Sequence, residues 1–219
     1  MLKEEKIFIK NDPLTIEALL HKGSSQKGVL VCHPHSLMGG SMYNNVVEAV
    51  AEVFAAQNYT TLRFNFRGVG ASSGNYDEGN GEAQDIIAAG RHLQELGLSE
   101  IYLCGYSFGA WAGAKAIARK DDMFSQCIFI SPPDKYFGFD FKALSGKVNL
   151  LICGNYDDFC DIHNMKYQSE VMESKLEIID GADHFYAGRE KEIQEILLKY
   201  IKFGHNTKKR GTILAKYHG

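Results

Sequence analysis

The 219-residue sequence is poor in the features that mark disulfide-stabilised, zinc-binding or membrane-spanning proteins. It has five cysteines but no CxxC pair, and four of them lie in short apolar runs, where a free thiol behaves as a small hydrophobe: Cys32, Cys104, Cys127 and Cys153. No run approaches 18 consecutive apolar residues, and the N-terminal MLKEEKIFIK is charged where a signal peptide needs an apolar stretch. These absences predict a cytoplasmic protein without a disulfide framework.

An excess of charge of one sign is also missing. The chain carries 24 Lys and Arg against 27 Asp and Glu, a formal net charge of -3, which gives no argument for a nucleic-acid or membrane partner. Hydrophobic residues at 45% and only four prolines are ordinary for a folded protein. At this length one well-buried core is expected, so we predict a single domain over residues 1–219.

The last residues, 205–219, form a locally basic tail with the run KKR. Such a short run is typical of a solvated surface, and a nucleic-acid site needs a wider basic patch. We expect Thr212–Tyr217 to pack on the body of the protein or on a partner subunit, which is compatible with a homodimer.

Short β-branched runs alternate with amphipathic stretches along most of the chain. The runs predict eight strands, of which the first two form a hairpin across an Asp-Pro turn and the second is antiparallel: 6–9, 14–20, 27–33, 60–66, 101–106, 126–131, 148–154 and 175–180. Apolar residues at helical spacing predict five helices: 42–57, 82–96, 108–119, 162–173 and 190–203. Repeated strand–helix–strand units need crossover connections, so we predict a three-layer α/β fold with a mostly parallel sheet and helices on both faces.

One serine stands between two glycines where a predicted strand gives way to a helix. Residues 104–113 read CGYSFGAWAG, which places Ser107 at this junction. In a G-x-S-x-G nucleophile elbow the turn is so sharp that a side chain two residues away would collide with it, and Gly105 and Gly109 remove those side chains. The elbow holds the hydroxyl at the carboxyl end of the sheet, beside a helix N-terminus. A glycine-rich turn with a helix-capping serine is the alternative interpretation.

A serine hydroxyl needs a base to take its proton, and in proteins with a G-x-S-x-G elbow the order along the chain is serine, acid, histidine. Four histidines follow Ser107. His184 lies in DGADHFY, a loop after the last predicted strand, and is the expected base; the others lie in a predicted helix or in the tail: His163, His205 and His218.

The acid is expected in the loop after strand 148–154, which reads GNYDDFCD. Asp157 and Asp158 both qualify by position. The residue order alone does not choose between the two carboxylates.

These motifs resemble the α/β-hydrolase superfamily over about residues 27–204, and most of all its small lidless branch near dienelactone hydrolases and bacterial carboxylesterases. The family's acid loop often reads G-x-x-D, which Gly154 to Asp157 matches, so the resemblance favours Asp157. The family's H-G-x-type loop corresponds to HPHSLMGG after the third predicted strand, with Pro34 in place of the more usual Gly. The resemblance implies that the backbone N–H groups of His35 and Phe108 form the oxyanion hole. RGVGASSG, residues 67–74, matches a loop whose role in the family is mainly structural, and its glycine spacing does not fit a dinucleotide-binding loop.

The segment between Ser131 and Val148 is too short for a helical lid, so an open or shallow cleft is expected. Aromatic residues near the motifs are candidates to line it: Tyr43, Tyr136, Phe137, Phe159 and Phe185, with Tyr76, Phe139, Phe141 and Tyr186 as further candidates. About half of them are expected to be core or loop anchors instead.

The sequence therefore predicts a cofactor-free serine hydrolase that cleaves an ester or related acyl bond of a small substrate. A lidless peptidase, a thioesterase and a noncatalytic binding protein with the same fold are the alternatives. His33 and His35 could instead be a pair of metal ligands, but no other Cys or His completes a spaced set, so we predict no metal and assign His33 a structural role.

Overall fold

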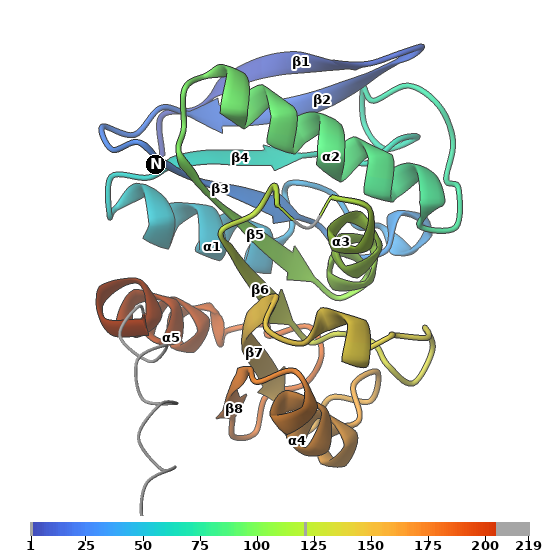
Figure 1. Ribbon diagram of the computed structural model, residues 1–219, viewed down its shortest axis with the longest axis vertical. Helices are drawn as coiled ribbons and strands as arrows, with labels where there is room; N and C mark the ends of the chain where they lie inside the picture. The colour runs from blue at the N-terminus through green and yellow to red at the C-terminus, as the bar shows by residue number, and fades with distance from the viewer. Residues whose placement is uncertain (1, 121, 205–219) are drawn as a thin grey trace, which may run out of the picture.

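The apolar runs form strands and the stretches between them form helices, in a computed structural model that describes residues 2–120 and 122–204 (Figure 1). The strands are β1 (Glu5–Asn11), β2 (Leu14–His21), β3 (Lys27–Cys32), β4 (Thr60–Phe64), β5 (Glu100–Tyr106), β6 (Gln126–Ile130), β7 (Val148–Gly154) and β8 (Lys175–Ile179). The helices are α1 (Asn45–Ala55), α2 (Asn80–Glu95), α3 (Phe108–Arg119), α4 (Ile162–Val171) and α5 (Glu190–Phe203). The tail, including Thr212–Tyr217, lies outside the described residues.

All eight strands belong to one sheet in the order β1-β2-β4-β3-β5-β6-β7-β8. β2 pairs antiparallel with both β1 and β4, and the remaining pairs are parallel. The predicted hairpin and the antiparallel second strand are therefore confirmed, as is the mostly parallel sheet. Because the central strands are parallel, the loops that follow β3, β5, β6, β7 and β8 meet at one edge of the sheet.

Helices cover both faces of the sheet, which gives the predicted three layers (Figure 1). Side chains alternate along each central strand: Val29 and Val31 pack toward α1 and α5, whereas Leu30 and Cys32 pack toward α2 and α3. The central strands are buried on both faces, as expected for a parallel sheet between two helical layers.

Within residues 2–120 and 122–204, no lid covers the carboxyl edge of the sheet. Between β6 and β7, at residues 131–147, the secondary structure consists of turns and a single 3₁₀ turn, Lys142–Leu144. The prediction of a lidless fold is confirmed. None of the helices in the described part of the chain combines the length and apolar composition that a membrane span requires.

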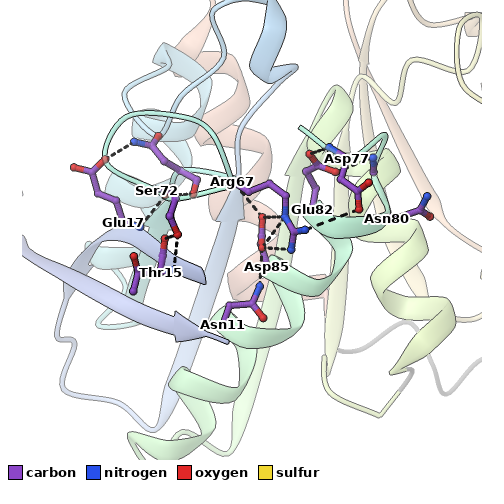
Figure 2. A network of polar contacts seen from close by, with 12 residues as sticks. Asn11, Thr15, Glu17, Arg67, Ser72, Asp77, Asn80, Glu82 and Asp85 are labelled. Atoms are coloured by element: carbon purple, nitrogen blue, oxygen red, sulfur yellow. Dashed lines mark hydrogen bonds and ion pairs between the residues drawn. The ribbon is translucent and has the colours of Figure 1, made fainter. Parts of the chain in front are cut away.

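The loop after β4 carries a network of buried charges (Figure 2). Arg67 reaches α2, where its Nη2 lies 2.8 Å from Asp85 Oδ1 and its backbone N–H donates to Asp85 Oδ2 at 3.0 Å. Asp85 is fully buried and also accepts from Asn11 Nδ2 at 2.7 Å. The Arg67–Asp85 pair thus joins this loop, α2 and the end of β1. These contacts give RGVGASSG the structural role that the family resemblance implies.

Replacing Asp85 with alanine is expected to lower the free energy of unfolding by about 3 to 5 kcal/mol, because a buried guanidinium loses its nearest counter-charge and keeps only the more distant Asp77 carboxylate at 3.9 Å. Chemical denaturation monitored by circular dichroism measures this loss. Glu192→Ala breaks the solvent-exposed ion pair with Arg189 and serves as the control, with little change expected. Equal effects of the two substitutions would contradict the structural role of Asp85.

Candidate active site

Ser107 lies at the turn between β5 and α3, with the strained backbone angles φ 54° and ψ -121°. Glycines permit this turn by letting three backbones approach one another. A Cβ on Gly105 would lie 2.5 Å from the carbonyl oxygen of Gly109, and a Cβ on Gly109 would lie 2.5 Å from the carbonyl oxygen of Cys32. The first glycine therefore clears space for α3 and the second clears space for the end of β3.

The structure brings the serine, one histidine and one aspartate together in a hydrogen-bonded row. Ser107 Oγ lies 2.8 Å from His184 Nε2, and His184 Nδ1 lies 2.9 Å from both carboxylate oxygens of Asp157. Each of the three residues is only 6% exposed. Asp158, the other candidate acid, is exposed and does not contact the imidazole. The exposed His163 lies on α4, away from this row.

Asp157 is held by backbone groups of its own loop. Its Oδ1 accepts hydrogen bonds from the N–H groups of Phe159 at 2.8 Å and Cys160 at 3.0 Å. The ring of Phe159 stacks on the imidazole of His184, with centroids 4.4 Å apart. One short loop therefore supplies both the carboxylate that meets the imidazole edge and the ring that covers one imidazole face.

The loop that carries His184 is anchored at three successive residues by side chains from other elements. Tyr106 Oη donates to the carbonyl oxygen of His184 at 2.7 Å, and Asn45 Nδ2 donates to that of Phe185 at 3.1 Å. The buried hydroxyl of Tyr186 pairs with Ser131 Oγ at 2.6 Å. The sequence analysis missed the contribution of Tyr106, although this residue stands inside the G-x-S-x-G motif.

Two backbone N–H groups beside Ser107 have no partner among the described residues. Phe108 is the first residue of α3, so its N–H has no intrahelical acceptor, and the N–H of His35 likewise donates to no described group. Both residues line the cavity at Ser107. His35 Nδ1 accepts the N–H of Leu37 at 3.2 Å, which fixes the turn that follows it.

A cavity of about 360 Å³ opens over Ser107. It is lined by Pro34, His35, Met38, Gly39, Gly40, Asn44, Tyr106, Ser107, Phe108, Pro133, Tyr136, Phe137, Phe159, His184 and Phe185. Four of the five main candidates for lining residues are among them, namely Tyr136, Phe137, Phe159 and Phe185.

Tyr43, the fifth candidate, does not line this cavity. Its ring centroid lies instead 5.6 Å from the guanidinium of Arg63, a residue distant in sequence. The four secondary candidates are also absent from the lining: Tyr76 packs against Phe108, Phe139 stacks on Phe141, and Tyr186 is buried. Met38 and Pro133 line the cavity but carried no sequence signal of their own.

His33 is a buried structural residue. Its Nε2 accepts the N–H of Phe66 at 3.0 Å, so the ring proton is on Nδ1, which donates to the carbonyl oxygen of Pro34 at 2.6 Å. Burial lowers the pKa of His33 from 6.5 to about 4. The described residues hold no group of three or more His, Cys, Asp or Glu side chains that could bind a metal ion.

Comparisons with known proteins agree with the fold. A family model described as alpha/beta hydrolase fold matches residues 29–149. The uncharacterized protein RP471 of Rickettsia prowazekii is 31% identical to this chain, and the alignment covers 97% of this chain and 91% of RP471.

Solved structures show the same similarity. An alpha-beta serine hydrolase homologue from Coxiella burnetii is 31% identical, with a TM-score of 0.82, and the alignment covers 90% of this chain and 97% of that one. XC6422 from Xanthomonas campestris, described as an a/b serine hydrolase without lid, is 25% identical with a TM-score of 0.81. The alignment covers 92% of this chain and 95% of XC6422. The chain belongs to the α/β-hydrolase fold family.

Tyr106→Phe is expected to lower the free energy of unfolding by about 1 to 3 kcal/mol, because the buried carbonyl of His184 loses its donor without a change of shape. Urea denaturation measures the loss. Tyr167→Phe, which removes the hydroxyl of an exposed tyrosine on α4, is the matched control. A Tyr106→Phe protein as stable as the wild type would show that this hydrogen bond does not anchor the loop.

His33 predicts a dependence of stability on pH. Its pKa in the folded protein lies below the unfolded value of 6.5, so the unfolded state binds protons first as the pH falls. The contribution of His33 to stability is present above about pH 6.5 and is lost as the pH falls toward about 4, by about 3 kcal/mol. NMR titration of the imidazole checks the cause, and a His33 ring that titrates near pH 6.5 in the folded protein would refute it.

Proposed function

We propose that this α/β hydrolase is a serine hydrolase that cleaves an ester or related acyl bond of a small substrate. The observation that carries the proposal is the unbroken row of Ser107, His184 and Asp157, with contacts of 2.8 and 2.9 Å. Nucleophile, base and acid are each within the hydrogen-bonding distance that proton transfer and orientation require.

In the proposed first step Ser107 Oγ attacks the acyl carbon while its proton passes to His184 Nε2. The new C–O bond gives a tetrahedral oxyanion, and Asp157 stabilises the imidazolium through Nδ1–H. The oxyanion then collapses, the bond to the leaving group breaks, and His184 Nε2–H protonates the departing heteroatom. Water repeats the sequence on the acyl-enzyme, which releases the acid and restores Ser107.

The unpaired N–H groups of His35 and Phe108 are the proposed oxyanion hole. Both lie at the cavity beside Ser107, and the position of Phe108 at the start of α3 adds the positive end of the helix dipole. Loss of one such donor typically costs about 3 to 4 kcal/mol of transition-state stabilisation. All proposed roles are filled by groups of this chain, and the mechanism needs no metal or cofactor.

Two features support an ester over the alternatives. The cavity is small and apolar, whereas a peptidase needs polar groups along an extended cleft to pair a peptide backbone. A noncatalytic binder has no use for the strained angles at Ser107, which cost about 1 to 3 kcal/mol. A thioesterase uses the same chemistry, so only assays with ester and thioester substrates distinguish the two activities. The five free cysteines support the proposed cytoplasmic location.

A fluorophosphonate probe is expected to label the wild-type protein covalently at Ser107, as located by peptide mass spectrometry. Ser107→Ala abolishes labelling because the nucleophile is gone, and His184→Ala slows labelling at least about 100-fold because the base is gone.

Two exposed residues provide matched controls: Ser145→Ala and His163→Ala are expected to label at the wild-type rate. Treatment with a chelator is expected to have no effect, which also tests the alternative metal site at His33 and His35. Undiminished labelling of Ser107→Ala would remove the proposed nucleophile.

A further inference from the structure

The cavity at Ser107 has an aromatic wall on the side of His184, formed by Tyr136, Phe159 and Phe185. Phe159 links the other two: its ring centroid lies 5.3 Å from that of Tyr136 and 6.2 Å from that of Phe185, the latter edge to face. The outer members are exposed, Tyr136 at 66% and Phe185 at 58%. Such a group of exposed rings beside a cavity is typical of a binding surface.

The other aromatic lining residues pack against one another and against the body of the protein. The ring of Phe137 lies 4.5 Å from that of Trp111 and 5.9 Å from that of Phe108, measured between centroids. His35 closes the same cluster, with its ring 4.8 Å from Phe108. The aromatic faces that remain available to a ligand are therefore concentrated on the side of His184.

The chemistry of the proposed reaction determines which part of the substrate meets this wall. The carbonyl oxygen must point to the N–H groups of His35 and Phe108, and the leaving heteroatom must lie within reach of His184 Nε2, from which it takes its proton. Groups attached to that heteroatom extend toward the rings that surround the imidazole. Phe159 stacks on the imidazole at 4.4 Å and Phe185 meets it edge-on at 5.8 Å.

The charge of the cavity restricts the leaving group further. None of the lining residues named above is Asp, Glu, Lys or Arg. Burial lowers the pKa of His35, which disfavours its charged form. A charged leaving group would lose hydration without gaining a counter-ion, whereas an uncharged ring gains contact with the wall.

We propose that the aromatic wall is a leaving-group subsite that selects acyl substrates whose alcohol part is an uncharged aromatic ring close to the scissile bond. This inference rests on the proposed function. An aromatic ring gains stacking interactions on the wall beyond its buried area, so it is favoured over a saturated ring of the same size.

The test compares three acetates that share one acyl group: benzyl acetate, cyclohexylmethyl acetate and ethyl acetate. Their alcohols are all primary and of similar acidity, so differences report binding of the leaving group and not its reactivity. For the wild type, kcat/KM for benzyl acetate is expected to exceed that for cyclohexylmethyl acetate by about 3- to 10-fold.

The double variant Tyr136→Leu/Phe185→Leu keeps the wall apolar and removes the aromatic faces of its two exposed members, while Phe159 stays in place beside His184. Its benzyl-to-cyclohexylmethyl ratio is expected to fall from the wild-type value toward about 1. The ratio is internal to each protein, so a partly unfolded variant does not distort it. Tyr167→Leu, an exposed tyrosine on α4 outside the cavity, is the matched control and is expected to keep the wild-type ratio.

The outcomes separate the two proposals. A wild-type ratio of 1 or below, or a double variant that keeps the full preference, overturns the aromatic subsite and leaves the serine hydrolase intact. Labelling of Ser107 by the fluorophosphonate without turnover of any of the three acetates also overturns the subsite. Failure of both labelling and turnover overturns the proposed function itself.

Discussion

The close approach of three backbones around Ser107 is the constraint on which the rest of the site depends. β5, α3 and the end of β3 meet where a Cβ on Gly105 or Gly109 would lie only 2.5 Å from a carbonyl oxygen. This contact holds Ser107 at φ 54°, with its hydroxyl directed to His184, and fixes Phe108 as the first residue of α3. A strained residue of this kind persists only when its surroundings determine it, and here the fully buried Phe108, Ala110 and Ala112 pack α3 onto the sheet.

The loops that carry the aspartate and the histidine follow β7 and β8, and a backbone bond from the Tyr156 N–H to the Ala182 carbonyl oxygen at 3.0 Å joins them. Side-chain hydrogen bonds complete their positioning. Asp157 accepts two N–H groups of its own loop, so its position is set locally. The position of His184 depends on residues distant in sequence. Tyr106 on β5 binds the carbonyl oxygen of His184, and Asn45 and Ser131 bind the next two residues of its loop. Side chains from three elements thus hold a loop that lies at the open, lidless edge of the sheet.

Local signals explain what could be predicted from the sequence. Strand and helix patterns gave the layers and the antiparallel hairpin, and the glycines around Ser107 marked the elbow, because each depends on residues close together in the chain. The choice between Asp157 and Asp158 depends on which carboxylate receives the N–H groups that follow, a detail of loop geometry. The prediction that Tyr43 lines the cavity was wrong, and the sequence around Tyr43 gives no sign of its actual partner, because Arg63 lies on β4. Nor does any local pattern reveal the stacking of Phe159 on His184.

The loop after β4 also binds the segment that carries one of the proposed oxyanion donors. Asn65 Nδ2 donates to Glu17 of β2 at 2.8 Å, and its Oδ1 accepts the N–H of Met42 at 2.8 Å, while the N–H of Phe66 binds His33. Both ends of the segment from His33 to Met42 are therefore tied to this one loop. That segment carries the N–H of His35, so a network of buried polar groups outside the cavity sets the position of one proposed oxyanion donor. Because a lidless cleft cannot close over its substrate, such groups have to be in place beforehand, and fixed donors of this kind cost no reorganisation when charge develops.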